Sequence, residues 1–527
     1  MLRYVGYSRA IDAPEISGQE FVKSVRLPQE IIDMIANEVD LPSAYQCALV
    51  ASCFVHPVRR RIFHSIRLSE SECHHVVSGG ISGCLADFLG LPRKADIRPA
   101  PSRSLRLVEI LDSAPELGAL VKELTIEGNS SKDALCPISS WYCHRQAPLP
   151  TILSRLPNLE QLSLLFPSTR PLFFRCLPID SAVAIVQAAQ SPNLRRIVLE
   201  NVLFDNKTVQ LGDLFEFISV CASGGCLSEI SISDHFTSGT TRHLLGPSLG
   251  APFPFTDVDA GGFDWCLKDL INATDIKPAH NTTISLSSLS IYGTDYLTRT
   301  VLDWAVGVDS PVSLDSLQSL ALGGVSRSSV LYASQVIQSC SKTLERLAFS
   351  QEASYFSPCP SMSPPLTSEL LHVKDLRFVD NCWDERLSSP TLYQWCAILE
   401  SSAPQHLTTF TADIHWHLDS IERGDRFRSV SWHRLESALS RVSPRAKLCV
   451  NVAITVSDSD AQSITRWKKV LGPDSGTLLA ECFPKSHRKG DGFAFAVTVS
   501  VASTPSRLRR PAFGYEYTPA QGWAQLQ

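Results

Sequence analysis

Apolar and polar residues follow one short pattern that recurs along most of the chain. In each copy an apolar residue is followed by two variable residues, a second apolar residue, one variable residue and a third apolar residue. The second and third apolar residues are two positions apart, so they would share one face of a short β-strand. Nine copies occur, and their central apolar residues are Leu124, Leu162, Ile197, Ile230, Leu289, Leu320, Leu347, Leu376 and Phe410.

The segments between these copies are typical of helices, as in residues 213–222, 331–340 and 391–400. A strand followed by a helix, repeated about every thirty residues, is the pattern of leucine-rich-repeat proteins. One such unit cannot bury its apolar side alone, so stacked units would share a core under a curved parallel sheet. The long interval between Ile230 and Leu289 indicates a lost copy or an insertion. A non-repeating α/β domain with apolar strands is the alternative.

The variable positions beside each central apolar residue are expected on the concave face of this sheet, where a peptide or a protein surface can bind. Their formal charges cancel, with three arginines against two glutamates and one aspartate. For any single residue, a solvated sheet position is the other interpretation. The candidate target-binding residues are Gln161, Ser163, Arg196, Glu229, Ser231, Ser288, Ser290, Arg346, Asp375 and Arg377.

A different pattern precedes the repeats. Pro28 suits the first position of a helix, because its missing N–H would have no partner there. Ile31, Ile35 and Val39 then form one apolar stripe at helical spacing. Two more short helices follow before residue 64. Three short helices cannot bury all their apolar side chains among themselves, so part of this surface should meet a partner. An ordinary cap on the next domain is the alternative.

The residues of this helical segment resemble an F-box, in the form common in large families of mushroom-forming fungi. The resemblance rests on Leu27-Pro28-x-Glu30-Ile31-Ile32-x-x-Ile35 and on Cys47-Ala48-Leu49-Val50-x-Ser52-x-Phe54. It implies a module that binds the Skp adaptor and joins a cullin–RING ubiquitin ligase. By position, the residues expected to make or support that interface are Leu27, Pro28, Ile31, Ile32, Ile35, Leu49 and Val50.

We therefore expect an α/β chain in which a three-helix F-box precedes an irregular leucine-rich-repeat solenoid with a curved parallel sheet. The resemblance implies a substrate-recognition adaptor that binds an unknown target protein. Residues 42–45 depart from the F-box pattern, and this favours an alternative, a non-catalytic repeat scaffold outside any ligase. The expected order is an extension (1–24), the F-box (25–68), a linker or first repeat (69–100), the solenoid (101–460), a C-terminal cap (461–501) and a flexible tail (502–527).

Composition narrows the class of protein further. The chain has 44% hydrophobic and 19% charged residues and a net charge of −5, which is typical of a globular protein and gives no reason to expect nucleic acid. No apolar run approaches the ~18 residues of a membrane span, and the N-terminus does not resemble a signal peptide. We expect a cytoplasmic or nuclear protein. The sixteen cysteines are then expected to be reduced, with Cys47, Cys221, Cys340, Cys396 and Cys449 buried.

No convincing catalytic or metal-binding motif is present in the sequence. A GxSxG string at residues 246–250 is followed by two prolines, which forbid the helix that a nucleophile elbow needs. The Cys-His clusters at residues 73–75 and 143–144 lack a second pair at metal-site spacing. His415 and His417 would share one face of a strand, where partial exposure explains them. We expect no enzyme active site, no cofactor and no metal.

Overall fold

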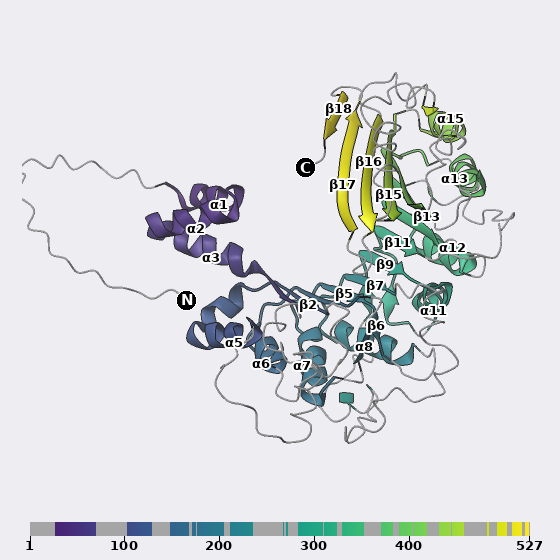
Figure 1. Ribbon diagram of the computed structural model, residues 1–527. Coiled ribbons are helices and arrows are strands. Elements are labelled where there is room, and N and C mark those ends of the chain that lie inside the picture. Colours follow the sequence, from purple (N-terminus) through teal and green to yellow (C-terminus); the bar gives the residue numbers. More distant parts are fainter. Residues whose placement is uncertain are drawn as a thin grey trace, which may run out of the picture. The chain divides into compact units, whose positions relative to one another are not determined.

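The structure is a computed structural model of the chain, which forms two compact units, Met1–Phe63 and His64–Gln527 (Figure 1). We describe each unit by itself. The described residues are 27–69, 103–128, 148–167, 171–174, 177–204, 211–234, 267, 270–271, 283–308, 310–323, 329–352, 370, 372–382, 389–402, 404–418, 432–443, 445–457, 482–483, 493–502, 509–518 and 522–525.

The first unit contains three helices, α1 (Gln29–Glu38), α2 (Leu41–Val50) and α3 (Val55–His64), with the short 3-10 helix η1 (Ser52–Phe54) before α3. Pro28 immediately precedes α1, and its carbonyl oxygen accepts hydrogen bonds from the N–H groups of Ile31 and Ile32. The core of the unit is small. Ala36, Ala44 and Val58 form its buried cluster, Val39, Ala48, Phe54 and Ile62 pack against them, and Ile32 is buried as well.

The second unit is built on a large open sheet, so the α/β class and the parallel sheet expected from the sequence are confirmed. Twelve strands are parallel, and each pairs with the preceding strand in this series. They are β1 (Ser65–Ser69), β2 (Glu123–Glu127), β3 (Gln161–Leu165), β5 (Arg196–Glu200), β7 (Glu229–Ser233), β9 (Ser288–Tyr292), β11 (Ser319–Gly323), β12 (Arg346–Glu352), β13 (Asp375–Cys382), β14 (Thr409–Leu418), β15 (Lys447–Ser457) and β16 (Phe493–Ala502).

The register of this sheet aligns the nine copies of the sequence pattern. The central residue of each copy is the pairing partner of the central residue in the next, from Leu124 to Phe410. All nine central residues are buried. Strands β7 and β9 pair directly, so the long interval after Ile230 is an insertion between neighbouring strands.

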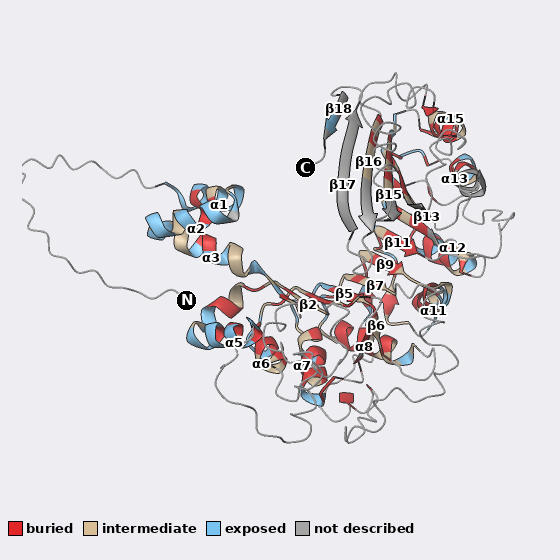
Figure 2. Cartoon of the chain, in the orientation of Figure 1, coloured by how far each residue is buried: buried red, intermediate tan, exposed pale blue. Residues whose placement is uncertain are grey.

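The helices of this unit lie along one side of the sheet, and the buried residues concentrate between the two layers (Figures 1 and 2). Most helices contact the next helix along the chain. They are α5 (Arg103–Ser113), the 3-10 helix η4 (Pro115–Leu120), α6 (Leu149–Ser154), α7 (Ile179–Ala189), α8 (Gly212–Ser223), α11 (Asp295–Val306), α12 (Val330–Ser339), α13 (Ser389–Ser402) and α15 (Trp432–Val442). Helices α8, α12 and α13 confirm the three helices expected from the sequence.

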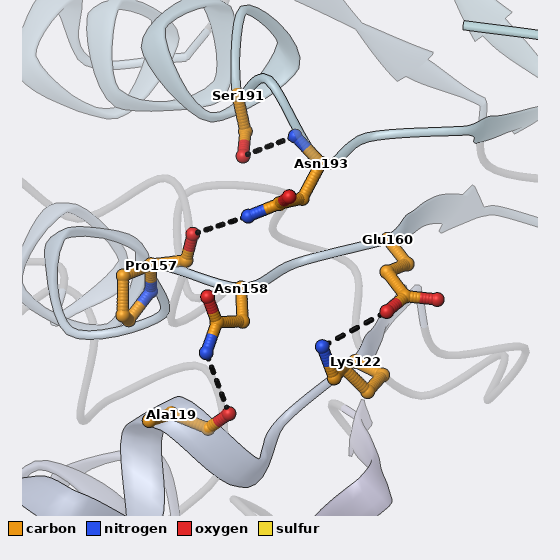
Figure 3. A network of polar contacts seen from close by, with 7 residues as sticks. All are labelled: Ala119, Lys122, Pro157, Asn158, Glu160, Ser191 and Asn193. Atoms are coloured by element: carbon orange, nitrogen blue, oxygen red, sulfur yellow. Dashed lines mark hydrogen bonds and ion pairs between the residues drawn. The ribbon is translucent and has the colours of Figure 1, made fainter. Parts of the chain in front are cut away.

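Polar side chains in the turns before the strands join one unit of the sheet to the next (Figure 3). Asn158 donates a hydrogen bond to the carbonyl oxygen of Ala119 (3.0 Å), and Asn193, at the equivalent position one unit later, donates to that of Pro157 (3.4 Å). Lys122 forms an ion pair with Glu160 (2.9 Å), and the hydrogen bond from Lys122 lowers the pKa of the Glu160 carboxyl. These contacts help to fix the register.

Asn201 makes a similar link at the other end of a strand. Its side-chain amide donates to the carbonyl oxygen of Phe166 (2.6 Å), and the residue is buried. Its φ of 52° lies in the left-handed region, which asparagine adopts more readily than most residues. Two short pairs flank the main sheet, β4 (Leu172–Phe173) with β6 (Val202–Leu203) and β8 (Ile284–Ser285) with β10 (Val312–Ser313).

The two ends of the sheet differ from the expectation. The compact helical unit ends at Phe63, before the expected F-box boundary at residue 68, and β1 pairs with β2. Strand β15, whose alternating apolar residues Leu448, Val450 and Val452 are equally typical of an edge strand, lies between β14 and β16. Alternating apolar residues do not distinguish an edge strand from an inner one whose outward face carries small polar residues.

Residues 502–527, expected to form a flexible tail, contain the antiparallel strands β17 (Arg509–Thr518) and β18 (Gly522–Gln525). Proline and arginine at the start of β17 argue against a strand in the sequence. The structure accommodates Pro511 at an irregularity, because the register shifts between Val499 and Ser500 of the partner strand. Bulges are among the few places where a sheet tolerates proline.

Candidate functional site

The helical unit presents large apolar side chains to solvent on two of its helices. Leu27, Ile31 and Met34, on and just before α1, are exposed. They are spaced by four and three residues, so they form one stripe. On α2, Tyr45 and Leu49 are spaced by four residues, and Val50 follows; Leu49 is 76% exposed and Val50 85%. We call this set of six side chains the apolar stripes.

The seven candidate adaptor-binding residues differ in how far they are exposed. Leu27, Pro28, Ile31, Leu49 and Val50 are exposed, and Ile35 is half-buried. Ile32 is only 6% exposed, so it supports the unit from inside and offers little surface to a partner. Sequence reasoning missed Met34 and Tyr45. Their helical spacing from Ile31 and Leu49 was the signal that would have found them.

An arginine on α3 fixes the end of α1. Arg61 donates from Nη1 to the carbonyl oxygen of Ala36 (2.7 Å) and to that of Val39. These carbonyls lie in the last turn of α1, where intrahelical partners run out and the helix dipole is negative. The cation therefore both satisfies the helix end and ties α3 to α1. The positions of Ile31 and Met34 depend on this contact, because α1 carries both.

The side chains of the apolar stripes do not contribute the free energy of burial to the folded unit, because they remain exposed. A fully buried side chain of this size contributes roughly 1.5–3 kcal/mol relative to its exposed state. Single exposed apolar residues are ordinary on protein surfaces, but grouped ones mark interaction sites. The buried core of the unit consists mainly of two alanines and a valine, whereas six large apolar side chains lie at its surface. This surface is suited to an apolar groove of another protein.

The second candidate surface is the side of the sheet that bears no described helix, which we call the open face. Side chains alternate along each strand, so the open face consists of the residues between the buried rows. In the first two of its rows lie all ten candidate target-binding residues. Gln161, Arg196, Glu229 and Ser288 are consecutive in the first row, and Ser163, Ser231 and Ser290 lie in the second; Ser163 is buried and offers little surface to a target.

Charges on the open face are segregated along the sheet. Strands β1 to β7 carry Glu123, Glu127, Glu200 and Glu229 against Arg67 and Arg196, which form ion pairs with Glu127 and Glu229. The first three open-face positions of β9 and β11 carry no charge: Ser288, Ser290, Tyr292, Ser319, Ala321 and Gly323. At their first three open-face positions, strands β12 to β15 expose Arg346, Arg377 and Lys447 against one exposed carboxylate, Asp375, and the fourth open-face position of β12 is Glu352. The formal charges of the variable positions cancel in the sequence because an acidic end and a basic end of the open face offset each other.

A polar cluster lies within the basic end. Asp413 on β14 is 4% exposed; it accepts a hydrogen bond and ion pair from Nε of Arg377 and a hydrogen bond from Nδ2 of Asn451 (2.7 Å). The Arg377 side chain is 59% exposed. A buried carboxylate is costly unless it is paired and hydrogen-bonded, and here both oxygens have partners. The cluster thus anchors an exposed guanidinium group to a buried acid.

Tyr292 on β9 is separated from Arg377 on β13 by small open-face residues of β11 and β12. Burial raises the pKa of the Tyr292 phenol, and the charges of Arg377 and Asp413 act on the same group in opposite directions. The phenol therefore stays protonated and can donate a hydrogen bond. Gly323 gives its ring room, because a Cβ there would lie 2.8 Å from Cδ1 of Tyr292. Between Tyr292 and Arg377 lie Ala348 and Ser350 on β12.

Sequence reasoning found Arg377 but missed Tyr292, Asp413 and Asn451. The search took only the two positions beside each central apolar residue, whereas these three belong to the next row of the open face. The strict alternation of β14 and β15 beyond that point was the available signal.

The candidate chemical motifs can be placed only in part. Residues 73–75, 143–144 and 246–250 lie outside the described residues, and His415 is a half-buried residue of β14. Within the described part of the chain, no group of three or more His, Cys, Asp or Glu could hold a metal ion. No described helix is long and apolar enough to cross a membrane.

Eight cysteines in the described part of the chain form no disulfide bond. Cys221, Cys340 and Cys396 are buried as expected, and burial raises the pKa of Cys396 to about 11. Cys47 and Cys449 are only half-buried, which corrects the expectation for these two residues. For Cys449 the reason is its place on the open face, between the buried Leu448 and Val450.

No protein-family model matches this chain, and a search of curated proteins finds no match. The chain has two candidate interaction surfaces, the apolar stripes of the helical unit and the open face of the sheet.

Proposed function

We propose that this chain is a substrate-recognition adaptor of an SCF-type ubiquitin ligase and has no active site of its own. In this proposal the helical unit is an F-box that docks on the Skp adaptor, which is bound in turn to a cullin. The open face is the concave surface of irregular leucine-rich repeats and binds the target protein. The observation that carries the proposal is the set of exposed apolar side chains on a separate, compact helical unit.

The exposed side chains support this function because five of the seven residues expected at the adaptor interface are exposed. Leu27, Pro28, Ile31, Leu49 and Val50 are available to a partner. Ile32 and the half-buried Ile35 would hold α1 in place beneath them. A groove of the Skp adaptor that buried Leu49 and Val50 would gain roughly 3–6 kcal/mol from these two side chains, before the costs of association.

The arrangement of the sheet supports the leucine-rich-repeat part of the proposal. Neighbouring strands are neighbours in sequence, the connecting helices lie on one side, and the pattern residues are in register. Such arrays use the helix-free side for binding, because that side has an extended surface free of connections. The lengths of the units vary, and one interval holds an insertion, so the repeats would be irregular ones.

Co-purification with a Skp adaptor tests the proposal. The full chain is expressed with the adaptor, and the double variant Leu49→Ser, Val50→Ser is compared with the unchanged protein. We expect the pair to lose adaptor binding without a change in thermal stability, because both side chains are largely exposed. Leu331→Ser on α12, exposed in the second unit, is the matched control and should bind normally. Equal recovery of adaptor with all three proteins would refute the docking role of α2.

A repeat scaffold that acts outside a ligase is the second candidate. It is favoured by residues 42–45 of α2, which differ from the F-box pattern and place Ala44 in the core and Tyr45 at the surface. Such a scaffold would use the same apolar stripes for another partner. Purification of the full chain from its native cells separates the two functions. Recovery of a stable partner without any cullin supports the scaffold, whereas recovery of a cullin supports the adaptor.

A further inference from the structure

We propose that the basic end of the open face, on strands β12 to β15, binds an acidic segment of a target protein, and that Arg377 contacts its carboxylate groups. This inference rests on the proposed function in one respect, because it names the class of target that the adaptor would bring to the ligase. The observation behind it is the segregation of charge on the open face, with Arg346, Arg377 and Lys447 at one end.

Arg377 is held in an orientation suited to a ligand. Its Nε atom contacts Asp413, and Asn451 donates to the second carboxylate oxygen, so the acid is fixed from two sides. The guanidinium is planar and carries donors on its terminal nitrogens as well as on Nε. Since the side chain is 59% exposed, a ligand can reach the guanidinium group, and a carboxylate can accept two parallel hydrogen bonds from such a group.

The buried acid is itself an argument for a role in binding. A buried ion pair is often no more stabilising than apolar residues of the same size. At the equivalent open-face position the neighbouring strands β11, β12 and β13 carry Gly323, Ser350 and Val379. The sheet therefore does not need a carboxylate at this row. A carboxylate that aligns an exposed arginine, however, reduces the entropy that the arginine loses when a ligand binds.

The other two cations lie where an extended segment can reach them. Arg346 pairs with Asp375, and Ala348 pairs with Arg377, so the two arginines are diagonal neighbours on adjacent strands. The Cα atoms of such neighbours are about 7–8 Å apart. Lys447 begins β15, two strands beyond Asp375. The residues between these cations are small, namely Ala348, Thr409 and Thr411, and leave the surface open. Asp375 also lies between these cations but is an exposed carboxylate, and its Oδ1 atom accepts a hydrogen bond from Thr408.

Nucleic acid is the other polyanion that a basic surface can bind, but the rest of the open face opposes it. Glu123, Glu127, Glu200 and Glu229 lie on the same face, and the whole chain carries a net charge of −5. Binding of nucleic acid normally requires a basic stripe without such an acidic end. A short acidic peptide segment can occupy the basic end alone, and the acidic end would then favour a target with opposite charges further along.

Fluorescence anisotropy on the full chain tests this inference. The probe is a labelled peptide with four glutamates in a Gly/Ser background, and the same peptide with four glutamines is its control. We expect the glutamate peptide to bind more tightly, and Arg377→Gln to weaken it by about tenfold, the loss of one charged hydrogen-bonded contact. Arg196→Gln, in the first row at the acidic end, is the matched control and should not weaken it.

Asp413→Asn distinguishes a positioned arginine from a general electrostatic effect. This change removes a negative charge, so nonspecific attraction predicts tighter binding of the glutamate peptide. The inference predicts weaker binding, because Arg377 loses its anchor. Should Asp413→Asn lower the melting temperature, Asn451→Ala gives a second test, with weaker binding again expected. Equal affinity for both peptides, equal losses in Arg377→Gln and Arg196→Gln, or tighter binding of a single-stranded oligonucleotide would overturn the inference.

The Arg377→Gln protein also separates this inference from the proposed function. In co-purification with the Skp adaptor it should behave like the unchanged chain, because Arg377 belongs to the second unit and the apolar stripes to the first. Normal adaptor binding with no preference for the glutamate peptide refutes the acidic target alone. Lost adaptor docking with an intact glutamate preference refutes only the ligase role.

Discussion

Arg61 on α3 donates a hydrogen bond to the main-chain oxygen of Ala36 in the last turn of α1, at 2.7 Å. This contact joins two helices that are separated by α2 in the sequence. It also explains why one of three consecutive arginines is partly buried while Arg59 and Arg60 are exposed.

Arg61→Ala should therefore destabilise the helical unit. The change leaves the carbonyl groups of Ala36 and Val39 without this donor, and we expect a loss of roughly 1–3 kcal/mol, the range for hydrogen bonds to charged groups. Hydrogen exchange of the α1 amides in the full chain measures this loss. Arg60→Ala is the control and should leave the exchange unchanged. Equal exchange in the two variants would show that Arg61 does not hold the helix end.

Gly323→Ala should destabilise the sheet near Tyr292. A Cβ at this position would lie 2.8 Å from Cδ1 and 3.0 Å from Cα of Tyr292, and the second of these is backbone. We expect a loss of roughly 1–3 kcal/mol in the free energy of unfolding, as for overpacked cores. Gly212→Ala has open space around the new Cβ and serves as the control in thermal denaturation. An equal melting temperature for the two variants would contradict the close approach.

Asn201 offers a test that separates two contributions. Asn201→Ala loses the buried hydrogen bond to Phe166 and places alanine at a φ of 52°, so a loss of roughly 2–4 kcal/mol is expected. Asn201→Gly loses the same bond but tolerates the backbone angle, so it should be less damaging than alanine. Urea denaturation ranks the three proteins. A glycine variant no more stable than the alanine variant would argue against backbone strain.

The ion pair between Lys122 and Glu160 should make stability depend on pH in the acid range. The pKa of Glu160 is lower in the folded chain than its ordinary value of 4.5, chiefly because Lys122 donates a hydrogen bond to it. Its contribution is therefore present above pH 4.5 and disappears as the pH falls through the lowered folded-state pKa. Glu160→Gln should be less stable than the unchanged chain at pH 7 and equally stable at low pH. A difference that persists in acid would exclude this pair as the cause.

The strands were predictable because each copy of the pattern buries the same three positions, as Leu159, Leu162 and Leu164 illustrate. The inner position of β15 was not predictable, since an edge strand accepts the same alternating residues. The polar cluster was also beyond prediction. Arg377, Asp413 and Asn451 are 36 and 38 residues apart and come together only when the register of three strands is known. On the helical unit, exposure of Leu49 depends on packing that spacing alone does not reveal.

The agreement between strand order and chain order has a consequence for how this protein forms during synthesis. Because each parallel strand pairs with the strand before it, the sheet is assembled largely from contacts of short sequence separation, and such topologies fold faster than non-local β structures. A growing chain can add each strand to an edge that already exists. The interval between β7 and β9 is the longest loop to close in this series, so it is where we expect elongation of the sheet to pause.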